Sequence, residues 1–150
     1  MRIGILGCGR IGQVHARSLM RLADAKLVAV ADAMPAAATA LAAQTGAEVR
    51  DTDDIINATD IDGVLLCTPT TLHYEQIHAA AKAGKAIFCE KPVDMSVDRI
   101  HDCIKVVTDN NVPFLTALNR RFDPNFANVQ SRISAGEIGE VEIVTILSRD

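Results

Sequence analysis

Three glycines near the N-terminus and one acid further along form the pattern with the clearest chemical meaning. Gly7, Gly9 and Gly12 directly follow the apolar run at residues 2–6, and Asp32 lies 20 residues beyond the last glycine. In such a pattern the first glycine permits a tight turn, the second lets the backbone approach a pyrophosphate, and the third lets a helix pack close to a strand. The acid accepts hydrogen bonds from ribose hydroxyls. The spacing therefore predicts a dinucleotide-binding site.

A glycine-rich turn can also be purely structural, and methyltransferases carry a related first turn. Here a strand, the turn, a helix, a second strand at residues 27–31 and the terminal acid follow one another in the expected order. The pyrophosphate would lie on unpaired N–H groups at the positive end of the helix dipole. The motif around Lys91 also sets the chain apart from methyltransferases, so dinucleotide binding is the preferred interpretation.

Lys91 is the side chain best suited to chemistry beyond binding. It stands between Glu90 and Pro92, directly after the apolar run at residues 86–89. A lysine at the mouth of a nucleotide cleft can donate a hydrogen bond to a substrate oxygen and take part in proton transfer. Pairing with the cofactor or with Glu90 explains it equally well from chemistry alone. The Lys91–Pro92 bond can be cis, which the sequence does not decide.

Several other residues have structural interpretations that we prefer. His15 lies on an apolar helix face and is expected to be a packed histidine with one local hydrogen bond. The acids at positions 51, 53 and 54 suggest a metal site, but acids at a helix start also stabilise its dipole, and no metal is expected. The cysteines at positions 8, 67, 89 and 103 lack metal-like spacing, which indicates reduced thiols of a cytoplasmic protein.

Composition narrows the class of protein. At 150 residues with 49% hydrophobic and 23% charged residues, the chain can bury a substantial core as an ordinary globular protein. A net charge of -4 without a basic cluster argues against a nucleic-acid partner. No apolar run approaches the ~20 residues that span a bilayer. We therefore expect a soluble protein with a small-molecule ligand and no membrane partner.

Apolar runs and helical periodicity alternate along the chain. Strands are expected near residues 2–6, 27–31, 47–49, 63–67, 86–89 and 113–118, with helices between them. Such alternation predicts an α/β fold with a doubly wound parallel sheet, the Rossmann fold, over residues 1–123. Ligands of this fold bind beyond the carboxyl ends of the strands. The glycine turn, Asp32 and residues 68–73, 90–92 and 119–123 all fall at such ends.

The last segment, residues 124–150, differs from the rest. A helix is expected from about Pro124 to Ala135, and residues 141–148 alternate as a strand does. This strand would be the first of a following domain. We therefore expect the chain to be the front part of a longer protein.

The motifs together resemble those of the Gfo/Idh/MocA oxidoreductases, which are NAD(P)-dependent enzymes acting mostly on sugars and cyclitols. The resemblance rests on the glycine turn, on Cys67-Thr68-Pro69 followed by His73, and on Glu90-Lys91-Pro92. It covers the whole chain. Residues 119–124 and 139–141 look closest to the inositol 2-dehydrogenase branch, and residues 148–150 also fit there.

The resemblance assigns roles to residues at the strand ends. It implies that the adenosine half of the cofactor is held by Gly7, Gly9, Arg10, Ile11, Gly12 and Asp32. It implies that the nicotinamide half lies near Thr68, Pro69, Thr70, His73, Glu90 and Lys91. Lys91 would also contact the reacting hydroxyl, and Arg121 would reach the substrate.

The implied reaction is NAD-dependent oxidation of a ring secondary alcohol, in myo-inositol or a related polyol or sugar, to a ketone. Lys91 would polarise the hydroxyl and join a proton relay. In the family an aspartate and a histidine from a carboxy-terminal α+β domain complete the site. His78 and His101 of this chain are poor replacements for them, because both lie in expected helices away from the strand ends. The 150 residues alone are therefore expected to bind NAD without turnover, and the full-length form is expected to be a homo-oligomer.

Two alternatives remain open at this point. One is another branch of the same family, such as a sugar dehydrogenase or an aldose–aldose oxidoreductase. The other is a non-catalytic NAD-binding or redox-sensing module, in which Lys91 and Arg121 would be additional cofactor and surface contacts. Asp32 favours NAD over NADP in every case, although Arg10 in the glycine turn offsets part of that preference.

Overall fold

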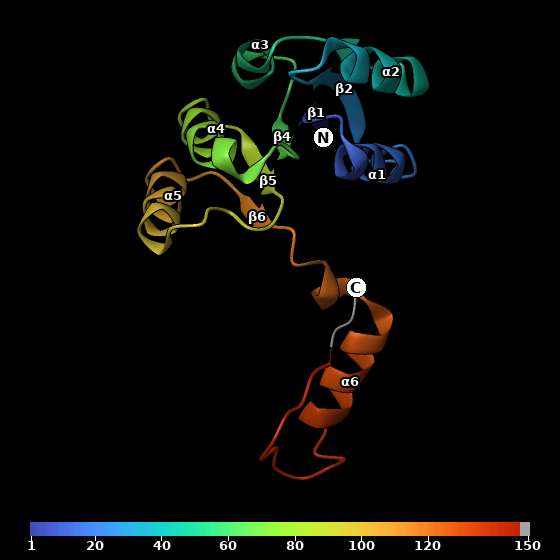
Figure 1. Ribbon diagram of the computed structural model, residues 1–150, viewed down its shortest axis with the longest axis vertical. Coiled ribbons are helices and arrows are strands. Elements are labelled where there is room, and N and C mark those ends of the chain that lie inside the picture. Colours follow the sequence, from blue (N-terminus) through green and yellow to red (C-terminus); the bar gives the residue numbers. More distant parts are fainter. Residues whose placement is uncertain (148–150) are drawn as a thin grey trace. The chain divides into compact units, whose positions relative to one another are not determined.

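The computed structural model describes residues 1–147 and separates into two compact units, Met1–Ala117 and a second that begins at Leu118. The first unit is a six-stranded parallel sheet in the order β3-β2-β1-β4-β5-β6, with helices on both faces (Figure 1). This order is the doubly wound arrangement, so the expected Rossmann fold is confirmed. The division falls a few residues before the boundary expected at Asp123.

The elements follow the alternation read from the sequence. The strands are β1 (Arg2–Leu6), β2 (Lys26–Ala31), β3 (Glu48–Val49), β4 (Gly63–Leu66), β5 (Ala86–Cys89) and β6 (Phe114–Thr116). The helices of the first unit are α1 (Arg10–Leu19), α2 (Pro35–Thr45), α3 (Thr52–Asn57), α4 (Thr70–Lys82) and α5 (Val97–Asp109). The second unit contains a 3-10 helix, η1 (Asn119–Phe122), and α6 (Pro124–Ser134).

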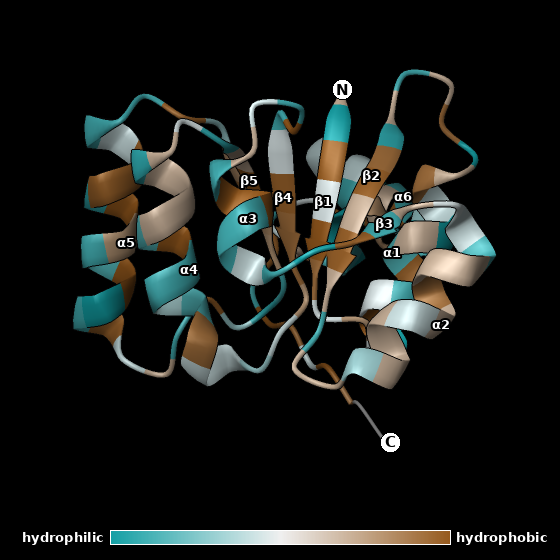
Figure 2. Ribbon diagram, turned by 90° about the horizontal axis from the view of Figure 1, so that it is seen from above, coloured by the Kyte–Doolittle hydropathy of each residue, from teal (hydrophilic) through white to brown (hydrophobic). Residues whose placement is uncertain are grey.

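Two hydrophobic cores lie on the two faces of the sheet. Successive side chains of a strand point to opposite faces, so Val64 and Leu66 of β4 enter the core under α3, α4 and α5, whereas Leu65 enters the core under α1 and α2. Figure 2 shows apolar residues gathered along the strands, with helices on both sides. Because both faces are covered here, the central strands read as continuous apolar runs.

Helices α2 and α3 begin, and α2 ends, at the residues whose backbone or charge preferences predicted it. Pro35 begins α2, where its missing N–H has no helical partner in any case, and Gly46 ends it with a φ of 74°. Asp53 and Asp54 lie in the first turn of α3. The acidic cluster thus occupies the positive end of a helix, as the capping interpretation predicted.

The second unit starts from a capped helix. The Asp123 carboxylate accepts hydrogen bonds from the N–H groups of Asn125 and Phe126 at 2.9 and 3.3 Å, and so caps α6. Residues 141–147 differ from expectation, because they form no strand, while Ser148 lies outside the described residues. A strand needs a neighbour for its N–H and C=O groups, and none of residues 1–147 pairs with this run.

None of the helices within residues 1–147 combines the length and apolar character needed to cross a membrane.

All four cysteines are free and buried. Burial is the main cause that raises the pKa of each thiol, to about 11 for Cys8 and Cys103 and to about 12 for Cys67 and Cys89. The Asp32 carboxylate raises the pKa of Cys8 further. The thiolate is the reactive form, so these side chains behave as small apolar core residues.

The thiols are therefore expected to be inert in the folded chain. With a pKa near 11, only about one thiol in a thousand is ionised at pH 8, and burial adds a steric barrier. An aromatic disulfide reagent should react at least about a hundredfold more slowly with the native chain than with the same chain in denaturant, where four thiols should titrate. Fast release of even one thiol equivalent from the native chain would contradict the described burial.

Candidate functional site

The carboxyl ends of β1, β2 and β4 meet at one edge of the sheet and border a cavity of about 800 Å³. This volume lies in the range of small-molecule and cofactor sites. Five of the residues singled out from the sequence line the cavity: Gly7, Gly9, Asp32, Thr68 and Pro69. The fold thus brings the glycine turn, the acid and the threonine–proline loop together.

The structure indicates a different reason for each of the three glycines. Gly7 has a φ of +98°, and a Cβ there would lie 2.5 Å from the carbonyl oxygen of Cys67. A Cβ on Gly12 would lie 2.0 Å from the carbonyl oxygen of Gly7. A Cβ on Gly9 would meet nothing within 4 Å. The protein itself therefore excludes side chains at Gly7 and Gly12, whereas the space at Gly9 is open to a ligand.

The beginning of α1 provides the anion-binding part. Gly9 is its N-cap, and no side chain of the described residues caps the helix. The first N–H groups of a helix have no intrahelical partner, so they favour an anion at this end. Arg10 and Ile11 are the first two residues of α1; Arg10 is exposed, and Ile11 packs against the core under α1 and α2.

The Asp32 carboxylate is fixed by two main-chain donors. Its Oδ2 accepts from the N–H of Cys8 at 2.6 Å, and its Oδ1 accepts from the N–H of Met34 at 2.8 Å. Each carboxylate oxygen can accept a further hydrogen bond. Asp32 is thus held in place by the glycine turn itself and keeps acceptor capacity for two hydroxyls, which fits an adenosine ribose.

Arg50 also lines the cavity and was not singled out from the sequence. Its guanidinium donates to both carboxylate oxygens of Asp60, at 2.9 and 2.8 Å, and to Glu48 at 2.9 Å. These partners, Asp60 foremost, raise the pKa of Arg50, and Arg50 lowers that of Asp60. The signal that could have revealed Arg50 is its position just after β3, since ligands of this fold lie beyond strand ends.

The loop after β4 forms the far side of the cavity. The hydroxyl of Thr68 donates to Oε1 of Gln76 at 2.6 Å, and Pro69 is the N-cap residue of α4. Thr70, the first residue of α4, does not line this cavity but a separate hollow of about 240 Å³ with Asp94 and Arg99. Thr68 and Pro69 are therefore the members of this loop that face the cofactor-sized space.

His73 is a link between two loops. It is 1% exposed, its Nδ1 lies 2.9 Å from the carbonyl oxygen of Pro92, and its Nε2 lies 2.9 Å from that of Thr68. Both ring nitrogens are thus used on the main chain, which leaves no polar atom of this side chain for a cofactor. We therefore interpret His73 as a support for the site loops rather than as a direct contact.

Lys91 is exposed and carries a free ammonium group. Within residues 1–147, no carboxylate lies in ion-pair distance of its Nζ. Its main-chain N–H instead donates to Glu90 Oε2 at 3.3 Å, and the Lys91–Pro92 bond is cis. The Lys91 side chain therefore does not pair with Glu90, which was one of the two non-catalytic roles considered for it.

Glu90 has a different partner, and here the expectation for His15 was wrong. Nε2 of His15 lies 2.6 Å from Oε1 of Glu90, so the expected local hydrogen bond is replaced by a contact across 75 residues. Helical periodicity places His15 on the inward face of α1 but cannot show which strand end lies opposite. The sequence offered one signal for this contact: His15 on a helix face and Glu90 at a strand end were both polar groups for which no partner had been assigned.

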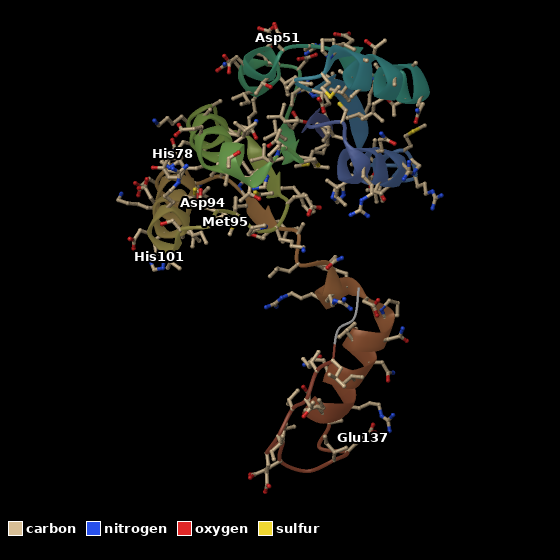
Figure 3. All side chains as sticks on the ribbon, in the orientation of Figure 1. Asp51, His78, Asp94, Met95, His101 and Glu137 are labelled. Carbon is tan, nitrogen blue, oxygen red and sulfur yellow. The ribbon has the colours of Figure 1, made fainter. Side chains whose placement is uncertain are left out.

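The remaining candidates lie elsewhere. Arg121 is an exposed residue of η1 in the second unit, so its role toward substrate stays a prediction. His78 on α4 lies 3.3 Å from Asp102 Oδ2, and His101 lies on α5 (Figure 3). Neither lines the cavity. Among the described residues, no group of three or more His, Cys, Asp or Glu side chains is arranged to hold a metal ion.

Comparison with known proteins identifies the family of this chain. The family model described as "Oxidoreductase family, NAD-binding Rossmann fold" matches residues 1–118. Inositol 2-dehydrogenase of Rhizobium meliloti (strain 1021) is 55% identical over the whole chain, and myo-inositol 2-dehydrogenase of Thermotoga maritima is 36% identical. The chain spans 46% of the length of each, somewhat less than half.

A solved structure shows the same fold with ligands. Scyllo-inositol dehydrogenase from Lactobacillus casei, with bound NAD(H) and scyllo-inositol, has a TM-score of 0.88 and 33% identity, covering 93% of this chain and 42% of that one. The six-stranded parallel sheet of this chain is thus the fold of an NAD-binding domain. The chain belongs to the Gfo/Idh/MocA family of oxidoreductases, and residues 1–118 are its NAD-binding Rossmann domain.

Proposed function

We propose that this chain is the cofactor-binding part of a dehydrogenase that oxidises a ring secondary alcohol of an inositol, or of a related polyol or sugar, to a ketone. The observation that carries the proposal is the cavity that joins the glycine turn and Asp32 to the Thr68–Pro69 loop. The inositol dehydrogenases among its relatives support the substrate class. Lys91 lies at the next strand end, and its ammonium has no ion-pair partner among residues 1–147, which supports a catalytic role.

The cofactor would lie along the strand ends. The pyrophosphate would bind over Gly9 and the first N–H groups of α1, next to Arg10 and Ile11. Asp32 would accept from the ribose hydroxyls. The nicotinamide would lie toward Thr68 and Pro69, because the cavity extends from the glycine turn to that loop.

The protein side of the reaction falls to Lys91. NAD, when bound, supplies the hydride acceptor. The Lys91 side chain would hydrogen-bond to the substrate oxygen and orient the hydroxyl, and in its neutral amine form it would accept the proton that leaves the hydroxyl and so become the ammonium. Glu90 and His73 would keep the loop that carries Lys91 in place through their contacts with Lys91 N–H and the Pro92 carbonyl. Arg121 would contribute to substrate binding.

The proposal includes a cytoplasmic location and a homo-oligomeric full-length form. The free, buried thiols support a reducing compartment. Exposed apolar side chains of the second unit, including Phe122, Val129 and Ile138, support self-association, because such surfaces mark interaction sites.

The glycines give a matched pair of variants for the cofactor site. Gly9→Ala should leave the free energy of unfolding within about 1 kcal/mol, because the added methyl meets nothing, yet weaken NAD at least about tenfold by filling the space for the pyrophosphate. Gly12→Ala should lower the free energy of unfolding by about 1–3 kcal/mol through its clash with Gly7. Denaturant unfolding and NAD calorimetry measure both quantities. Unchanged NAD affinity in Gly9→Ala would refute the binding mode.

Asp32 should make the site prefer NAD to NADP. A 2′-phosphate about 4 Å from the carboxylate would be repelled by roughly 1–4 kcal/mol, so NAD should bind at least about fivefold more tightly. Asp32→Asn removes the charge but retains an acceptor, and it should narrow the gap chiefly by improving NADP. Asp32→Ala should also weaken NAD itself. Equal affinities of the unaltered chain for NAD and NADP would contradict this reading of Asp32.

The reaction is tested with a polyol panel and NAD, using the native gene product that carries these 150 residues. Inositols should be oxidised, and Lys91→Met should lower kcat by on the order of a hundredfold or more, because a proton-transfer group is lost, with little change in NAD affinity. Turnover of sugars instead would indicate another branch of the family. NAD binding without turnover of any polyol or sugar would indicate a non-catalytic module.

A further inference from the structure

We propose that His15 is a positioning residue for Lys91 that acts through Glu90: its contact with the Glu90 carboxylate fixes the loop that carries the lysine, and it holds that carboxylate away from the Lys91 ammonium. This inference rests on the proposed function, because it gives His15 a part in keeping the lysine ready for the substrate. It starts from a contact between α1 and the end of β5 that neither the glycine pattern nor the Glu-Lys-Pro motif contains.

The His15 ring is fixed from two sides. Its Nε2 lies 2.6 Å from Glu90 Oε1, and the two side chains are only 21% and 16% exposed. The ring also packs edge-on against Phe88 of β5, the strand that ends just before Glu90, with 5.1 Å between the ring centroids and 71° between the ring planes. A short contact in a mostly buried setting is stronger than an exposed one.

Glu90 stands between the histidine and the lysine. One of its oxygens contacts His15, and the other accepts the main-chain N–H of Lys91 at 3.3 Å. A carboxylate next to a lysine in the chain would otherwise be a ready partner for its ammonium. These two contacts fix the orientation of the Glu90 carboxylate, and in this orientation the Lys91 ammonium has no carboxylate partner among residues 1–147.

The same contact ties two parts of the site together. α1 begins at the glycine turn, where the pyrophosphate is proposed to bind, and His15 lies on this helix. Lys91 lies on the loop after β5. The His15–Glu90 contact therefore fixes the lysine loop relative to the cofactor-binding helix, and small displacements between reacting groups have large effects on rate.

A double-mutant cycle in the native gene product tests the proposal. His15→Ala and Glu90→Ala should each lower kcat about tenfold with less than about a threefold change in KM for NAD, and the double variant should be no worse than either. His15→Gln, whose amide can also donate to Glu90, should restore most of kcat. His101→Ala removes an exposed histidine of α5 and should behave as the parent. Multiplying effects in the double variant, or no rescue by glutamine, would overturn the proposal.

A second measurement needs no turnover. Acylation of Lys91 in the 150-residue chain is followed by mass spectrometry, with Lys26 as an internal reference. His15→Ala should slow Lys91 acylation about threefold, the size expected for a new surface ion pair with Glu90, and adding Glu90→Ala should restore the parent rate. An unchanged rate in His15→Ala would overturn the proposal. If no polyol is oxidised, the proposed function fails, and this measurement alone decides the role of His15.

Discussion

The parallel pairing of β1 with β2 on one side and with β4 on the other is the constraint on which the site depends. Parallel strands end at the same edge of a sheet, and the ladder continues past the strands through Gly7 N–H to the Ala31 carbonyl and Cys67 N–H to the Leu6 carbonyl. The tight approach of Gly7 to Cys67 is part of this ladder. Three segments that are remote in sequence are thereby placed around one cavity, with the acid at its edge fixed by the turn.

The parts of this arrangement that depend on local spacing could be predicted from the sequence. Continuous apolar runs indicate strands buried on both faces, and Pro35 and Gly46 mark a helix start and end by their own backbone preferences. The glycine turn is largely local, because the positive φ of Gly7 and the close approach of Gly12 to Gly7 arise within one strand–turn–helix unit. The fold class and the cofactor follow from such units in series.

The parts that depend on which side chains meet could not be predicted in the same way. His15 and His73 look alike in sequence, each on the inward face of a helix, yet one binds a carboxylate and the other two main-chain carbonyls. These partners come from the crossing of helices over strand ends, which periodicity does not encode. Arg50 was missed although the strand before it was predicted, because its pairing with Asp60 depends on which segments meet in the fold. Residues 141–147 carry a strand-like pattern, but pairing needs a neighbour that the pattern does not supply.

The long separation between His15 and Glu90 has a consequence for biosynthesis. The glycine turn leaves the ribosome first, but Glu90, the partner of His15 on its helix, follows 75 residues later, so the first βαβ segment emerges without the other half of its site. Contacts between residues so far apart in sequence form slowly, because the entropy cost of closing a long loop comes before the contact can stabilise the chain. A nucleotide therefore gains its full set of contacts only after β4 and β5 have joined the sheet, and its stabilising effect on folding is greatest from that point on.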